Sequence, residues 1–140
     1  MPLIAKAARR TPFTGNLIIL INSNSASASE ITTRFLQLEG RATVIGDRSA
    51  GAVMGAVYYP RGVGGLKFLE FGLQITEQDI LMPDEGRLEN VGVTPEFIVL
   101  PTGADIAAKR DPQMVRALQL AGMHLTPEEA WKVYQTREDH

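Results

Sequence analysis

Three serines between Asn24 and Glu30 alternate with alanines, and this stretch has the clearest potential for chemistry in the chain. It follows a run of aliphatic residues and precedes a helical pattern, so its serines lie where backbone N–H groups are unpaired and the helix dipole is positive. Such N–H groups could stabilise an oxyanion that forms on a substrate carbonyl. The alternative is ordinary helix capping by serine, with an acidic residue in the first turn. The serines are Ser25, Ser27 and Ser29.

The segments around the serines predict a strand–helix–strand unit. Residues 17–21 are five branched aliphatic residues in a row, which is typical of a strand buried on both faces. Apolar residues at helical spacing predict a helix over 28–39, ended by Gly40. Residues 43–45 predict a second buried strand. Together these segments predict a βαβ unit with a right-handed crossover.

The middle of the chain predicts further strands. Residues 57–59 indicate a short strand and residues 60–65 a glycine-rich turn. Residues 69–75 alternate apolar and polar side chains, which predicts a strand with one buried face. Gly72 inside that strand indicates a bulge or a close backbone approach. Residues 97–100 predict one more short strand.

The last third of the chain predicts helices. Thr102 and Asp105 have the spacing of an N-cap pair, and Asp111 followed by proline opens a helix to about residue 121. Residues 126–129 form a capping box with proline at the first helical position. This box predicts a final helix that runs through Tyr134.

The composition limits the classes of function. The 140 residues fit one domain, and a net charge of -2 gives no electrostatic reason to expect nucleic acid or an anionic membrane as partner. The absence of cysteine excludes disulfides and thiolate sites. The two histidines, His124 and His140, leave little material for a metal cluster, so we expect neither metal nor cofactor. No membrane span or secretory signal is visible, and residues 1–14 predict an extended N-terminal arm.

Several segments together resemble the C-terminal processing (tail-specific) serine peptidase family. The serine run 25–30, the segment 40–47 and the stretch 91–96 are similar to its motifs. The last of these looks like the signature Gly-Val-x-Pro-Asp, with Glu96 in place of the usual aspartate. The resemblance implies an α/β fold with a Clp-protease/crotonase-like ββα core. It also implies that residues 15–140 are part of a catalytic domain with a helical C-terminal tail.

The resemblance implies roles for two residues of the serine run. Ser27, the middle serine, corresponds to the nucleophile, and the backbone N–H of Ala28 corresponds to one donor of the oxyanion hole. In the family, the second donor comes from a glycine segment upstream of the first residue of this chain.

The general base is the point at which this chain departs from the family. In the best-known branch, a lysine stands 25 residues after the nucleophile, where this chain has Ala52. An aspartate sometimes found 11 residues after the nucleophile is here Leu38. The Ser–Lys dyad is therefore not encoded at the expected place, and the chain is closer to the tricorn-like branch.

The tricorn-like branch uses a Ser–His–Glu relay whose histidine lies upstream. Its acid precedes the Gly-Val signature, which makes Glu89 the candidate acid and Glu85 a weaker one; the alternative for Glu89 is an exposed loop carboxylate. Lys67 and His124 are less suitable bases, because a solvated strand lysine and a surface histidine are the simpler interpretations.

These residues predict serine-type peptide-bond hydrolysis by acyl transfer, as an endopeptidase or C-terminal processing peptidase, with low activity for the 140 residues alone. One alternative is a non-catalytic peptide-binding or scaffold module, and another is a crotonase-like acyl-thioester enzyme. The expected partner is a protein or peptide substrate, with homo-oligomerisation left open and neither nucleic acid nor membrane insertion expected. The resemblance implies an extracytoplasmic, periplasmic setting for the full-length protein.

Overall fold

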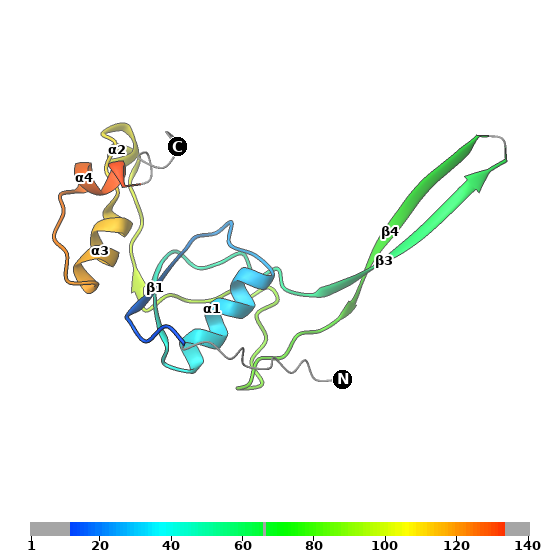
Figure 1. Ribbon diagram of the computed structural model, residues 1–140, viewed down its shortest axis with the longest axis horizontal. Coiled ribbons are helices and arrows are strands. Elements are labelled where there is room, and N and C mark those ends of the chain that lie inside the picture. The colour runs from blue at the N-terminus through cyan, green and yellow to red at the C-terminus, as the bar shows by residue number, and fades with distance from the viewer. Residues whose placement is uncertain (1–11, 66, 134–140) are drawn as a thin grey trace.

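A computed structural model describes residues 12–65 and 67–133 of the chain, and these residues form five strands and four helices. The strands and α1 form the body and a long hairpin that projects from it, while α2, α3 and α4 lie on the opposite side of the body (Figure 1). In chain order the elements are β1 (Leu17–Ile21), α1 (Ala28–Leu38), β2 (Ala42–Gly46), β3 (Gly55–Gly64), β4 (Phe68–Gln78), β5 (Phe97–Ile98), α2 (Gly103–Ala107), α3 (Pro112–Leu120) and α4 (Pro127–Lys132).

The body is built on a parallel sheet with the strand order β1-β2-β5. The predicted βαβ unit is confirmed, because α1 connects β1 to its parallel neighbour β2 and packs on β2. Gly40, with a φ of 60°, follows the last residues of α1 as expected. The prediction that residues 17–21 are buried on both faces is wrong. In the described residues β1 is an edge strand, and of its five residues only Ile21 is buried.

The hydrophobic core is shared between strands and loops. Two of its buried members, Ile21 and Val44, lie in β1 and β2, whereas the others come from the long connection between β2 and β5. These loop members are Val53, Met82, Leu88 and Val93. The core therefore holds loop segments in place as well as the sheet. Two of these segments, around Val53 and Leu88, extend to the candidate site.

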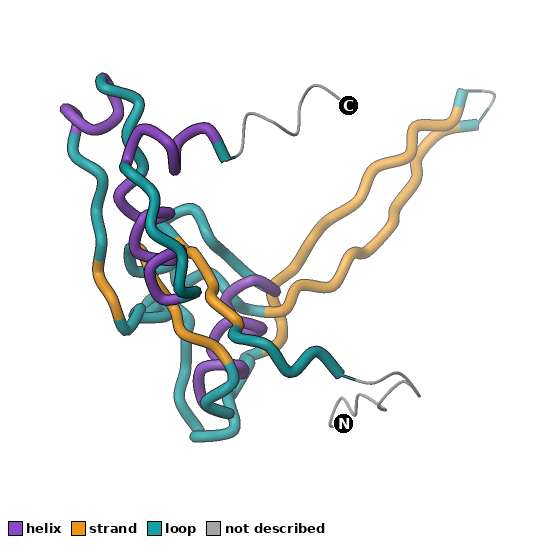
Figure 2. Tube along the Cα trace, turned by 60° about the vertical axis from the view of Figure 1, so that its left-hand side comes forward, coloured by secondary structure: helices purple, strands orange, loops and turns teal. Residues whose placement is uncertain are grey.

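The hairpin of β3 and β4 differs most from the sequence-based expectation. The two strands pair antiparallel from Gly55↔Gln78 to Gly64↔Phe68, and both views show them extending away from the body (Figures 1 and 2). The predicted turn over 60–65 is wrong, because Pro60 lies inside β3. Proline is tolerated there because each strand of a two-stranded ribbon has a free edge. The predicted buried face of residues 69–75 is also wrong, since every residue of β4 is exposed.

Gly72 makes room for a side chain rather than forming a bulge. The register shift of the hairpin lies between Gly55 and Ala56. A Cβ at position 72 would collide with the ring of Tyr58, which lies over the glycine from the opposite strand. The predicted close approach is therefore present, but it is made by an aromatic side chain and not by backbone.

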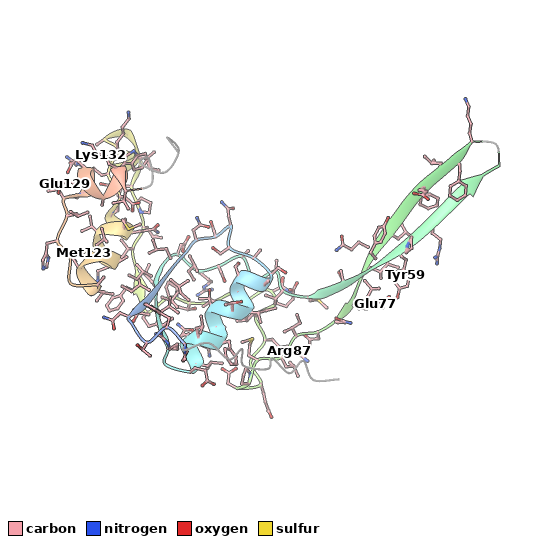
Figure 3. The ribbon with its side chains drawn as sticks, viewed as in Figure 1. Tyr59, Glu77, Arg87, Met123, Glu129 and Lys132 are labelled. Carbon is pink, nitrogen blue, oxygen red and sulfur yellow. The ribbon has the colours of Figure 1, made fainter. Side chains whose placement is uncertain are left out.

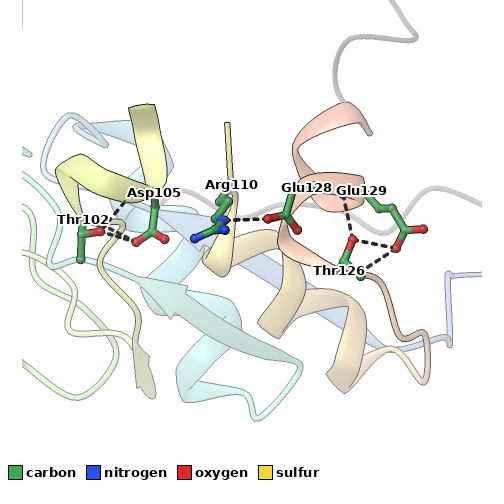
Figure 4. A network of polar contacts seen from close by, with 6 residues as sticks. All are labelled: Thr102, Asp105, Arg110, Thr126, Glu128 and Glu129. Atoms are coloured by element: carbon green, nitrogen blue, oxygen red, sulfur yellow. Dashed lines mark hydrogen bonds and ion pairs between the residues drawn. The ribbon is translucent and has the colours of Figure 1, made fainter. Parts of the chain in front are cut away.

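The three C-terminal helices begin at the predicted caps. The Thr102 hydroxyl accepts a hydrogen bond from the N–H of Asp105 at 3.1 Å, and the Thr126 hydroxyl accepts one from the N–H of Glu129 at 3.2 Å (Figure 4). An ion pair of 2.6 Å joins Arg110 to Glu128. Because both side chains are about half exposed, this pair contributes at most about 1 kcal/mol. The predicted extension of the last helix to Tyr134 and most of the arm over 1–14 lie outside the described residues.

Candidate active site

Ser27 lies on the sharp turn between β1 and α1, at the N-terminal end of the helix. Its backbone has φ 57° and ψ -125°, a conformation that residues with a Cβ rarely adopt and that costs about 1–3 kcal/mol. The turn is held by the Ser27 N–H, which donates to the carbonyl oxygen of Ala52 at 2.8 Å and to Oε2 of Glu30 at 3.0 Å. A serine on a strained strand-to-helix turn is also the arrangement of a nucleophile elbow, which presents Oγ to solvent.

The three serines of the run differ in what their hydroxyls do. The Ser25 hydroxyl accepts from the N–H of Asn22 at 3.1 Å, and the Ser29 hydroxyl donates to the carbonyl of Ala26 at 2.7 Å. Ser27 is exposed and makes no side-chain cap hydrogen bond to the helix that it opens. Two serines are therefore engaged in local structure, while the side chain of Ser27 is exposed and lacks a cap hydrogen bond to the helix.

Ala28 is the first residue of α1 and is exposed. An N–H at this position has no intrahelical acceptor, because the carbonyl four residues earlier lies outside the helix. Within the described chain, no hydrogen bond from the Ala28 N–H occurs among the backbone contacts of this turn. This N–H is therefore free at the positive end of the helix dipole, beside the Ser27 side chain.

Glu30 is the centre of the hydrogen-bond network behind Ser27. Its side chain is 1% exposed, and its Oε1 accepts from the Ser49 hydroxyl at 2.5 Å and from the Gly51 N–H at 2.7 Å. Its Oε2 accepts from the N–H groups of Ala52 and Ser27, both at 3.0 Å. Burial acts to raise the pKa of Glu30, but the four donors stabilise the carboxylate and hold the pKa below its ordinary value of 4.5.

Sequence reasoning assigned Glu30 only to the first turn of a helix and gave Ser49 no role. The signal that could have identified Glu30 is its spacing of three residues from Ser27, which is that of a capping box. In the structure, this carboxylate ties the Ser27 turn to the loop over residues 49–52. The turn and the loop are therefore positioned as one unit.

The Gly-Val signature holds the other side of that loop. Ser49 donates its N–H to the Val93 carbonyl at 3.1 Å, and its hydroxyl accepts from the Val93 N–H at 2.6 Å. Gly92 has a φ of 72° and packs against the backbone of Ser49. Glu96, which replaces the usual aspartate, accepts from the Val44 N–H in β2 at 2.7 Å. The signature therefore links the central sheet to the loop that contacts Ser27.

Replacing Gly92 with alanine is expected to destabilise the fold by about 2–3 kcal/mol, because the strain of a positive φ is combined with a steric clash. The new Cβ would lie 2.5 Å from the Ser49 carbonyl oxygen. Gly40→Ala is the matched control, since Gly40 has a φ of 60° but open space around it, and it should cost about 1 kcal/mol. Urea unfolding measures both values. Equal losses for the two variants would contradict the importance of the close approach.

The structure places the candidate acid Glu89 beside the same loop. Its Oε2 accepts from the N–H groups of Val53 at 2.8 Å and Met54 at 3.2 Å. These residues directly follow Ala52, whose carbonyl accepts from Ser27. The side chain of Glu89 is half-buried rather than an exposed loop carboxylate. The weaker candidate, Glu85, lies in an exposed turn with a φ of 60°.

The candidate positions for a general base are spread over the molecule. Ala52, which stands where the resemblance implies the family's lysine, accepts a hydrogen bond from the Ser27 N–H at its carbonyl oxygen. Leu38 is the last residue of α1, roughly 15 Å along the helix from its start. Lys67 lies at the tip of the hairpin, and His124 follows Met123 in the connection between α3 and α4, on the side away from the hairpin (Figure 3). In the described ranges, no lysine or histidine lies in the segments that contact Ser27.

The chain is similar in sequence to one peptidase family and to named proteases. The model of peptidase family S41 matches residues 4–99. A carboxy-terminal-processing protease of Bartonella bacilliformis is 36% identical over 83 residues, which are 59% of this chain and 18% of that protein. A carboxyl-terminal-processing protease of Synechocystis is 29% identical over 107 residues, which are 74% of this chain and 24% of that protein. The chain thus spans less than a quarter of the length of these relatives.

Solved structures share the fold. The tricorn protease superposes with a TM-score of 0.63 at 24% identity, over 82% of this chain and 12% of the protease. A protein from Parabacteroides merdae superposes with a TM-score of 0.61 at 26% identity, over 81% of this chain and 34% of that one. The predicted α/β class with a Clp-protease/crotonase-like core is therefore confirmed. On the family match, which covers more than half of its residues, the chain belongs to peptidase family S41.

Proposed function

We propose that this chain carries the nucleophile of a serine peptidase, either an endopeptidase or a C-terminal processing peptidase. The observation that carries the proposal is the strained turn at Ser27, with an exposed hydroxyl and the free N–H of Ala28 beside it. Strain of this kind persists only where the surrounding structure imposes it, and it concentrates at functional sites. The network centred on Glu30 imposes it here.

The reaction proceeds by acyl transfer. The Oγ of Ser27 attacks the scissile carbonyl carbon, and its proton passes to a general base. The carbonyl oxygen becomes an oxyanion that the Ala28 N–H stabilises, together with a second donor from outside these residues. The base returns the proton to the leaving amine, and water then hydrolyses the acyl-enzyme and regenerates the hydroxyl.

The general base is proposed to come from outside the 140 residues and to approach on the side of Ala52. Two observations support this assignment: Ala52 contacts Ser27, and Glu89 lies at the next two residues of the loop. As in a Ser–His–Glu relay, the Glu89 carboxylate would orient the base and stabilise its protonated form. The 140-residue chain alone is then expected to turn over an unstructured peptide no faster than its Ser27→Ala variant. Turnover by the chain that Ser27→Ala abolishes would contradict the assignment.

A fluorophosphonate probe tests the nucleophile directly, because it forms a phosphorus–oxygen bond with an activated serine and releases fluoride. Labelling of the full-length protein at Ser27, lost in Ser27→Ala and retained in Ser29→Ala, is the expected result. Ser29 is the matched control because its hydroxyl is engaged by the Ala26 carbonyl. Absence of labelling in the full-length protein would instead favour a peptide-binding or scaffold module. That alternative is supported by the segments that contact Ser27, which contain no lysine or histidine among the described residues.

The proposal extends to the setting and partners of the full-length protein. We infer a periplasmic protein that acts on protein or peptide substrates, supported by its relatives, which are named carboxy-terminal-processing proteases. Separately, none of the helices in residues 12–65 and 67–133 is long and apolar enough to cross a membrane. Fractionation of the native cells, with the protein found only in the cytoplasm, would contradict the inferred setting.

A further inference from the structure

The two faces of the projecting hairpin differ in kind. The register pairs Tyr59 with Leu73 and Arg61 with Phe71, and directly opposed residues of an antiparallel pair share one face. That face, called the apolar face below, is formed by aliphatic and aromatic side chains along both strands. Its members are Val57, Tyr59, Val63, Leu69, Phe71, Leu73 and Ile75.

The opposite face has a more mixed composition. Two aromatic rings lie over glycines of the facing strand: the ring of Tyr58 lies over Gly72, and the ring of Phe68 lies over Gly62. The other residues of this face include polar ones such as Gln74. These two rings stay exposed, at 62% for Tyr58 and 63% for Phe68, but glycines, Pro60 and polar residues separate them. On the apolar face, by contrast, the apolar side chains follow one another along both strands, and none of them is buried in the described chain.

The apolar face is large enough to matter. Its members Val63, Leu69 and Leu73 are 60%, 65% and 53% exposed. With side chains of about 150–200 Å² each, the whole face leaves roughly 600 Å² of apolar surface in water. Monomers rarely expose a contiguous patch above a few hundred Å², and an isolated two-stranded hairpin is marginally stable. A second sheet packed on the apolar face would bury the exposed patch and stabilise the hairpin.

Two charges on the apolar face point to what covers it. Arg61 lies among the apolar residues toward the tip, and its side chain has no ion pair in the part of the chain that the structure describes. Glu77 lies at the base, where Tyr59 donates its hydroxyl to Oε1 at 2.7 Å (Figure 3). The face thus has a cation near one end and an anion at the other. Two such faces packed antiparallel bring each Arg61 toward the Glu77 of the other copy.

We propose that the apolar face of the hairpin is a two-fold interface between copies of this chain. The hairpins pack face to face and antiparallel, as two small sheets with interdigitating apolar side chains. The total buried area of roughly 1,200 Å² lies at the lower limit of stable interfaces, so dissociation constants on the order of micromolar are expected. The interface lies at a distance from Ser27 along the projecting hairpin and does not depend on the proposed peptidase function.

Sedimentation equilibrium of the 140-residue chain between about 1 and 200 µM tests the proposal. The chain should form a discrete dimer, and Leu73→Glu should weaken its association at least tenfold. Gln74→Glu is the matched control, because it introduces the same charge at the next residue on the opposite face, and it should change association less than twofold. Circular dichroism checks that both variants fold. A monomer throughout the range, or equal effects of the two variants, would overturn the proposal.

Charge reversal tests the antiparallel arrangement itself. Arg61→Glu and Glu77→Arg should each weaken the dimer several-fold, and the double variant should return to within about twofold of the original. Within one hairpin the two positions are roughly 20 Å apart, which is beyond the screening length of about 8 Å at physiological salt. Restoration therefore requires a contact between copies. If another segment of a longer protein covers the face, that protein remains a monomer whose mass Leu73→Glu does not change, and the proposal is wrong.

Discussion

Replacing Ser27 with glycine is expected to stabilise the fold by about 1 kcal/mol while it removes all reactivity at the turn. Glycine adopts the conformation of φ 57° and ψ -125° without the clash that a Cβ causes, which releases part of the strain stored there. Fluorophosphonate labelling should fall to background, because no hydroxyl remains at the turn. Urea unfolding and labelling of the same preparations measure both effects.

Ser27→Ala separates the two causes. Alanine removes the hydroxyl but keeps the Cβ, so labelling should be lost while the free energy of unfolding stays within about 0.5 kcal/mol of the original. A glycine variant less stable than the alanine variant would show that the turn is not strained. The combination of higher stability with lost reactivity is the signature of a site that has sacrificed stability for function.

Replacing Glu30 with glutamine is expected to destabilise the protein by about 3 kcal/mol and to abolish labelling of Ser27. Each carboxylate oxygen of Glu30 accepts two hydrogen bonds. Glutamine replaces one of these oxygens with an NH₂ group, which cannot accept, so the two donors on that side lose their acceptor. The loss would be a large share of the 5–15 kcal/mol typical of a small domain. An NH₂ in place of Oε2 removes one of the two acceptors of the Ser27 N–H, and an NH₂ in place of Oε1 removes the acceptor of the Gly51 N–H in the loop that contacts the turn. In both cases the serine should no longer be held in its strained conformation.

Glu129→Gln is the matched control for this substitution. Glu129 occupies the same third position of a capping box, at the start of α4, but it is exposed. The same chemical change should cost it less than about 1 kcal/mol. Similar losses for Glu129→Gln and Glu30→Gln would mean that the buried network adds nothing beyond capping.

The pH dependence of stability provides a second readout of Glu30. Its pKa in the folded protein lies below the ordinary value of 4.5, so its contribution is fully present above that value and is lost as the pH falls through the folded-state pKa. The difference in unfolding free energy between the original protein and Glu30→Gln should therefore be constant near pH 7 and shrink below pH 4.5. A difference that stays constant down to pH 3 would contradict the role of the charge.

The sequence predicts well those elements that depend on a pattern of neighbouring residues. β1, α1 and β2 follow from aliphatic runs and helical spacing, and the C-terminal helices follow from their caps. The hairpin was mispredicted because Pro60 and its neighbouring glycines are typical of a turn, and no local signal tells a projecting ribbon from a packed sheet. The half-buried state of β1 likewise depends on its place at the sheet edge, which is a property of the tertiary structure.

The candidate site was only partly accessible to sequence reasoning. Ser27 and the adjacent position of Ala52 follow from the family motif, and the structure brings the two into contact. The buried network of Glu30 and Ser49 joins residues 19 apart in the chain, and its meaning depends on burial that no local pattern encodes. Glu89 was found as a loop carboxylate before a signature, but its contact with the Val53 N–H appears only in the fold.

The hydrogen bonds at the base of the hairpin make the fold tolerant of changes in the length of the connection between β2 and β5. Two hydrogen bonds, from the Asn90 N–H to Gly51 and from the Val53 N–H to Glu89, join the two ends of this long connection near the sheet. The entropy of closing a loop grows only with the logarithm of its length, so halving the part beyond these hydrogen bonds changes the closure free energy by about 0.6 kcal/mol. The ribbon can therefore lengthen or shorten over generations of sequence change while the turn at Ser27 keeps its geometry.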